Sequence, residues 1–299
     1  MNAISPATLS ASLPFYWSVR RELWENRSIY IAPMVVAGLV LLGVLIGTGH
    51  ILKALRGMDA LTPAKQIVTA VTPYSLAASV ILLASFIVGL FYCFGALNSE
   101  RQDRSILFWK SMPVSDLLTV LSKASIPLVV LPAIAFTVAL ATQLVMLIVS
   151  TIVLLANGIS PAKLWTPLPM FSITVVMAYG VVVHALWFAP IYAWVLLVSA
   201  WAKRAVFLWA VLPFVAFNVV EFIALGTSWF GTVMRYRVLG ATAEAFTVGA
   251  GVGNGVFITQ ISQLDPVKFL STPNLWLGLG FAVACLTFAV RLRRFREPN

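Results

Sequence analysis

Few side chains in this chain have types and spacings that could carry out chemistry. His50 and His184 are the only histidines, and neither belongs to a His-Glu-x-x-His pattern or to a cluster with metal-ligand spacing. The two cysteines, Cys93 and Cys285, lie within apolar runs, where a thiol behaves as a small apolar group. The serines form no Gly-x-Ser-x-Gly motif. The sequence therefore predicts neither a metal site nor a catalytic site.

Three polar residues within apolar runs are candidates for a translocation path or a gate. His184 lies in "YGVVVHALWF", where an interhelical hydrogen bond is the alternative role. Glu221, with Asn218 one turn before it, lies about 24 Å along a helix from Lys203 and Arg204, and its alternative is a carboxylate that surfaces at the membrane interface. A single acid does not specify an ion-coupled transporter, which normally shows polar groups from several helices.

One short stretch, "NSERQDRSILFWKSMPVSD" at 98–116, is charged and then aromatic. Its charges cannot remain in lipid, whereas residues 106–109 are too apolar for water. A short helix parallel to the membrane and docked into a groove on another protein satisfies both; an interfacial loop anchored by Trp109 is the alternative. We expect Pro113 to end that helix and Ser115 to cap the next one.

The elements that position these residues must be membrane helices. Hydrophobic residues make up 61% of the chain and charged residues 10%, against about 25% charged in soluble domains. Six charge-free runs reach the ~20 residues that a crossing needs. The third run contains Pro127 and Pro132, which indicate one long kinked helix, with a re-entrant hairpin as the alternative. The predicted spans are 29–48, 73–97, 118–156, 172–199, 205–225 and 274–290.

The net charge of +10 is interpreted through its distribution between loops rather than as a sign of nucleic-acid binding. With the N-terminus in the cytoplasm, thirteen Lys and Arg residues face the cytoplasm and seven face the other side, which together make the 20 in the chain. Both termini and the 98–116 stretch are therefore expected to be cytoplasmic. No cleavable signal peptide is apparent, so the first span is expected to remain in the mature protein.

Two further segments flank the spans. Residues 12–27 show an amphipathic pattern with Trp17 and Trp24, which predicts an interfacial helix; a solvated lead-in is the alternative. The outer segment 226–273 contains "GAGVGNG", but no Gly-Lys-Ser/Thr follows it, so a flexible connection is expected rather than a phosphate loop. The whole chain, 1–299, is interpreted as one transmembrane domain.

Three features resemble the membrane-spanning permease subunits of ABC-2 type ABC transporters. The lead-in "RRELWENRSIYIAP" at 20–33 is similar to the family's connecting helix. The loop "SERQDRSILFWKSMPVSD" is similar to its loop between the second and third spans. Six spans with both ends inside complete the resemblance. It implies an all-α fold of the type V exporter kind in a bacterial inner membrane.

The resemblance also implies partners. A cytoplasmic ABC ATPase subunit, in two copies, would bind ATP and Mg, and a second permease subunit would complete a homodimer among membrane lipids. The 98–116 loop would be the coupling helix. In it Glu100, Arg101 and Arg104 would make polar contacts with the ATPase, Phe108 and Trp109 would fill its groove, and Lys203 and Arg204 would form a second contact. The cargo would be hydrophobic or amphipathic. The long outer segment departs from the short outer helices of small members.

The alternative function is a self-sufficient membrane protein. A secondary transporter or an intramembrane enzyme would use His184 and Glu221 as its reactive pair and would act without a partner.

Overall fold

The computed structural model describes residues 12–102, 115–247, 258 and 260–295. Within these residues the chain is helical, and its one pairing of extended backbone is an isolated bridge between Phe246 and Leu264. The all-α prediction is confirmed for this part of the chain.

Six helices are long and apolar enough to cross a membrane, and they lie at the six predicted positions. The chain is therefore a multi-pass membrane protein. The crossing segments are α2 (Ser28–Ile46), α4 (Pro63–Ala96), α7 with α8 (Asp116–Ser125 and Leu131–Ala156), α10 (Met170–Trp201), α11 (Val206–Leu225) and α15 (Pro273–Phe295).

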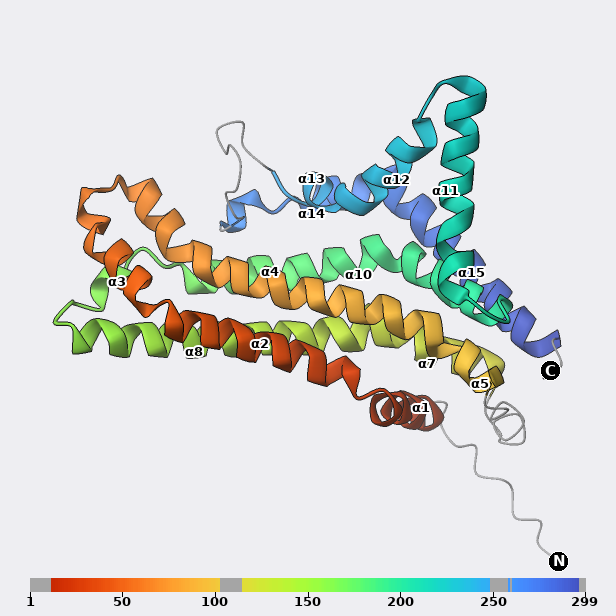
Figure 1. Ribbon diagram of the computed structural model, residues 1–299, viewed down its shortest axis with the longest axis horizontal. Coiled ribbons are helices and arrows are strands. Elements are labelled where there is room, and N and C mark those ends of the chain that lie inside the picture. The colour runs from red at the N-terminus through yellow and green to blue at the C-terminus, as the bar shows by residue number, and fades with distance from the viewer. Residues whose placement is uncertain (1–11, 103–114, 248–257, 259, 296–299) are drawn as a thin grey trace, which may run out of the picture.

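The spans form an elongated bundle in which α2, α4, α8 and α10 lie side by side and α15 packs along α10 (Figure 1). The terminal end of the bundle holds α1 (Ser12–Glu25), α5 (Asn98–Gln102), α7 and the last turn of α15. The distal end holds α3 (Thr48–Arg56), η1 (Met58–Ala60) and α9 (Ala162–Trp165). Helix α11 leans away from the bundle and packs mainly against α10.

The third span is one continuous helix from Asp116 to Ala156, so the re-entrant hairpin is wrong. Its two α-helical parts are joined by a π-helical turn, η2 (Ile126–Val130), which contains Pro127. Proline lacks the N–H that an α-helical hydrogen bond needs, and the wider π turn accommodates that loss without a break. Ser115 caps α7 as predicted, because its Oγ accepts a hydrogen bond from Leu118 N at 3.2 Å.

Helix α1 divides its apolar residues between two faces. Val19 and Leu23 pack on the core, whereas Trp17 and Trp24 are exposed. The guanidinium of Arg20 lies 5.1 Å and 4.8 Å from their ring centroids, a cation–π arrangement. Exposed tryptophans beside an arginine suit the headgroup region, as expected for a helix at the membrane interface.

The described parts of the outer segment are largely helical. They form α12 (Trp229–Leu239), α13 (Ala241–Ala245), η3 (Ile261–Gln263) and α14 (Pro266–Ser271); the glycine-rich "GAGVGNG" lies outside the described residues. Trp187 of α10 donates its indole N–H to Arg237 O at 2.7 Å, and the Arg237 guanidinium stacks on the same ring at 4.7 Å. These contacts fasten the outer segment to the bundle.

Candidate functional site

Glu100 is the first described residue of the predicted coupling stretch with a charged side chain, and it points into the protein. It belongs to α5, directly after the second span, and is 5% exposed. One carboxylate oxygen lies 3.1 Å from Lys123 Nζ, and the other lies 2.6 Å from Arg293 Nη1. The Glu100 carboxylate is therefore paired with cations inside the chain, and its predicted contact with an ATPase stays a prediction.

Five further charged residues join Glu100 in what we call the terminal ion cluster. Lys123 Nζ donates to Glu22 Oε1 at 2.7 Å, and Tyr92 OH donates to the other Glu22 oxygen at 2.8 Å. Lys123 and Glu22 are 2% and 3% exposed, so both partners of this ion pair are buried. The cluster comprises Arg21, Glu22, Glu100, Asp116, Lys123 and Arg293.

Two arginines, Arg21 of α1 and Arg293 of α15, complete the cluster. Arg293 Nε lies 3.0 Å from Asp116 Oδ1, and Arg21 Nη2 lies 3.4 Å from Glu100 Oε1. Burial works against the charge of Arg21, but its hydrogen bond to Glu25 and the nearby carboxylates outweigh burial and raise the pKa of Arg21 above its ordinary value.

The terminal ion cluster connects α1, α5, α7 and α15, which are far apart in the sequence. A buried charge is costly unless it is paired, so these elements cannot separate without exposing unpaired charges or admitting water. A crevice of about 650 Å³, lined by Glu22, Glu100 and Lys123 among others, reaches the cluster between α1 and α4. The arrangement is suited to holding the start of the 98–116 stretch rigidly against the spans.

Ser199 of α10 secures the same point from within the bundle. Its hydroxyl donates to Phe94 O at 2.9 Å and accepts from the N–H groups of Leu97 and Asn98 at 3.2 Å and 3.1 Å. These are backbone groups at the junction of α4 and α5, where helical hydrogen bonding is interrupted. The junction is therefore fixed by a fully buried side chain.

The other predicted coupling residues lie partly outside the described part of the chain. Arg101 belongs to α5, and Arg104, Phe108 and Trp109 lie outside the described residues. Lys203 and Arg204 are exposed in the tight turn between α10 and α11, as expected for a loop.

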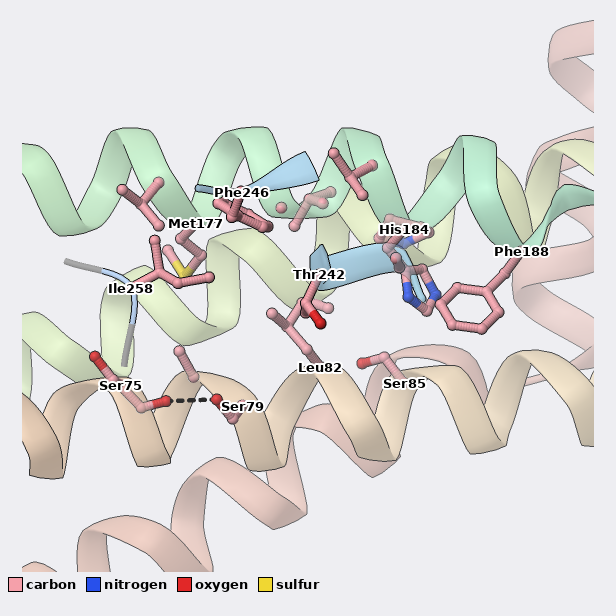
Figure 2. A pocket seen from close by; sticks show the side chains of 18 of the residues that line it. Ser75, Ser79, Leu82, Ser85, Met177, His184, Phe188, Thr242, Phe246 and Ile258 are labelled. Carbon is pink, nitrogen blue, oxygen red and sulfur yellow. Dashed lines mark hydrogen bonds between the residues drawn. The ribbon is translucent and has the colours of Figure 1, made fainter. Parts of the chain in front are cut away.

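A second site, the central cavity, lies in the middle of the bundle and has a volume of about 670 Å³. Its walls come from α4, α8 and α10, and the outer segment covers it (Figure 2). Figure 2 shows Ser79, Leu82 and Ser85 of α4 on one side and Thr242 and Phe246 of the outer segment facing them. None of the described lining residues is Asp, Glu, Lys or Arg.

His184 is the predicted path residue that lines the central cavity. Its Nε2 lies 3.2 Å from Tyr192 OH, and its ring packs against Phe86 and Phe188 at centroid distances of 5.4 Å and 4.7 Å. His184 thus lines the cavity, but Tyr192 belongs to the same helix, α10, so this hydrogen bond lies within one helix and is not the interhelical bond that was the alternative. A role for His184 in a translocation path stays a prediction.

Glu221 and Asn218 lie away from the central cavity and serve the turn between α11 and α12. The Glu221 carboxylate accepts hydrogen bonds from Thr227 Oγ1, Trp229 N and Phe230 N at 2.9, 2.7 and 2.9 Å. It therefore caps the first turn of α12, where a negative charge is favourable. Asn218 lies against Gly231, where a Cβ atom would be 2.4 Å from its Nδ2. These two residues line no part of the central cavity.

Among the described residues, no three His, Cys, Asp or Glu side chains gather in a way that could hold a metal ion. No family model, curated protein or solved structure matches the chain. The terminal ion cluster and the central cavity are therefore the features on which a functional argument rests.

Proposed function

We propose that this chain is the membrane-spanning permease subunit of an ATP-driven ABC exporter of the ABC-2 type. In this proposal the 98–116 stretch docks on a separate ATPase subunit that binds ATP and Mg, two such ATPase subunits act on two permease subunits, and the terminal end faces the cytoplasm of a bacterial cell. In this proposal the chain forms the path for the cargo, and the ATPase subunits alone bind the nucleotide.

The observation that carries the proposal is the attachment of Glu100. Cations from α1, α7 and α15 contact its carboxylate, namely Arg21, Lys123 and Arg293. A segment that merely rests at the membrane surface needs no such attachment. A segment on which another protein acts does need it, because a force on a loosely held loop would be lost in local motion.

The same contacts give a route for the motion. Displacement of the 98–116 stretch would move α7 through Lys123, and α7 continues through the π turn into α8. The first residues of α8, including Leu131 and Pro132, line the central cavity. Packed helices switch between discrete arrangements, so repacking at the π turn would change the cavity when the ATPase closes.

Affinity purification of the tagged protein in mild detergent, followed by mass spectrometry, tests the proposal. We expect an ABC ATPase in equal amount, which is lost when Phe108 and Trp109 are both changed to Ala. Trp165→Ala is the matched control, because Trp165 is an exposed tryptophan at the distal end. Purification of the chain alone, or retention of the ATPase by the Phe108 and Trp109 double variant, would contradict the proposal.

The self-sufficient alternative requires His184 and Glu221 to act as a pair. Glu221 is occupied by three hydrogen-bond donors at the α11–α12 turn, whereas His184 lies in the central cavity. If His184→Ala and Glu221→Gln each abolished transport in liposomes without ATP, this alternative would replace our proposal.

A further inference from the structure

The central cavity has the size and lining of a small-molecule site. Its volume of about 670 Å³ falls within the roughly 300–1,000 Å³ that such sites occupy. Most of its lining is apolar, including Leu82, Met177, Phe188 and Phe246. Because none of the described lining residues is an Asp, Glu, Lys or Arg, a charged molecule would be buried there without an opposite charge. The lining therefore favours a neutral, mostly apolar occupant.

Gln143 of α8 adds a specific polar requirement. Its side chain is 0% exposed and lines the cavity, and its Nε2 donates to Tyr74 O at 3.1 Å. The Oε1 atom of the same amide is buried and has no hydrogen-bond partner. A buried acceptor without a partner is unfavourable, and a donor on a bound molecule would remove that cost.

The serines on the α4 wall point to the same chemistry. Ser79 Oγ donates its proton to Ser75 O at 2.8 Å (Figure 2), and Ser85 Oγ donates to Ile81 O at 2.9 Å. Their protons are used within the helix, so the hydroxyl oxygens offer lone pairs to the cavity. This wall therefore accepts hydrogen bonds more readily than it donates them.

We propose that the central cavity binds a neutral, mostly apolar molecule that carries a hydroxyl or amide N–H, and that the Gln143 amide turns toward the cavity so that this group donates to its buried Oε1. A charged molecule and a pure hydrocarbon chain both fit the lining worse. The claim that this molecule is the cargo rests on the proposed function, whereas the binding itself does not.

Photolabelling of the purified full chain in lipid nanodiscs tests the binding without any ATPase. The probe is dodecanol with a diazirine in its chain, and the control probe is its methyl ether, which lacks the donor. We expect the alcohol to label cavity residues such as Leu82 and Met177 saturably and to be displaced by unlabelled dodecanol. The ether should bind with roughly tenfold lower affinity, because it cannot donate the hydrogen bond and a single hydrogen bond to a buried acceptor changes the affinity by about tenfold.

Two variants locate the site. Gly180→Leu fills the cavity, because a Cβ at Gly180 would meet only Phe246 Cζ, at 4.0 Å, and it should abolish the saturable labelling. Gly38→Leu is the matched control: a Cβ there meets nothing within 4 Å and Gly38 does not line the cavity, so labelling should be unchanged. In the Gln143→Leu variant, the affinity of the alcohol probe should fall to that of the ether probe.

Several results would overturn the inference. Equal saturable labelling by the alcohol and the ether would mean that a hydrocarbon chain, such as a lipid tail, is the occupant. Labelling that unlabelled dodecanol does not displace would reflect contact with bulk lipid. Saturable labelling that survives Gly180→Leu would place the site elsewhere. Because no ATPase is present, each of these results is independent of whether the proposed function holds.

Discussion

Replacement of Lys123 by Met should destabilise the protein strongly. Lys123 is 2% exposed and neutralises two buried carboxylates, with its Nζ 2.7 Å from Glu22 and 3.1 Å from Glu100. Methionine keeps most of the side-chain volume but leaves Glu22 without a cation. Removal of one partner from a buried ion pair costs about 3–5 kcal/mol. At about 2–4 °C per kcal/mol, the Tm should fall by roughly 6–20 °C.

Thermal unfolding in detergent, followed by the fluorescence of the native tryptophans, measures this shift. Lys65→Met is the matched control, because Lys65 is exposed in the first turn of α4, and it should change stability by no more than about 0.5 kcal/mol. Adding Glu22→Gln to Lys123→Met removes both charges of the pair. The loss of stability in the double variant should then be about 1–3 kcal/mol smaller than the sum of the losses in the two single variants. A Tm for Lys123→Met within about 1 °C of the wild type, or full additivity, would refute the buried cluster.

Two further substitutions test local packing. Gly231→Ala should lower stability by about 1–3 kcal/mol, because the new Cβ would lie 2.4 Å from Asn218 Nδ2, and Asn218→Ala in the same chain should restore most of the lost Tm. Ser199→Ala removes the acceptor for the N–H groups of Leu97 and Asn98, so hydrogen exchange of this α4–α5 junction should accelerate while that of α8 stays unchanged; equal rates in the two proteins would contradict this role for Ser199.

The spans could be predicted from the sequence because the bilayer imposes both length and apolarity on them. The limits of prediction are seen at their ends. The second span begins at Pro63, ten residues before the predicted start, because its first turns carry Lys65 and extend past the apolar run. The last helix runs to Phe295, beyond the predicted 290, for the same reason. A helix can continue beyond the apolar run where its charged side chains reach water, and a hydropathy pattern does not predict this extension.

The terminal ion cluster could not be predicted, because its pairs are separated by long stretches of chain. Glu100 and Arg293 are 193 residues apart, and Glu22 and Lys123 are 101 apart. The sequence did contain a signal: Glu22 and Lys123 are opposite charges that each flank an apolar run. Without the helix packing, such residues are indistinguishable from ordinary anchors at the membrane surface.

His184 and Glu221 illustrate how the same signal can have two meanings. Both are polar residues in apolar runs, yet His184 lines the central cavity and Glu221 caps α12. The cap depends on how the chain turns after Gly226, whose φ of 64° is readily adopted by glycine. The sequence alone did not predict α12, so it could not show what the Glu221 carboxylate would meet.

The most direct test of the account is a cross-link from the predicted coupling stretch in native membranes. Ser111→Cys supplies the reactive thiol and keeps Phe108 and Trp109, while Cys93 and Cys285 are buried and should not react. Lys163→Cys, in α9 at the distal end, is the control. The account predicts that a short thiol-reactive cross-linker joins position 111 to an ABC ATPase, with a yield that changes on addition of ATP, and that position 163 gives no such product. Absence of an ATPase product from position 111, or the same products from both positions, would contradict it.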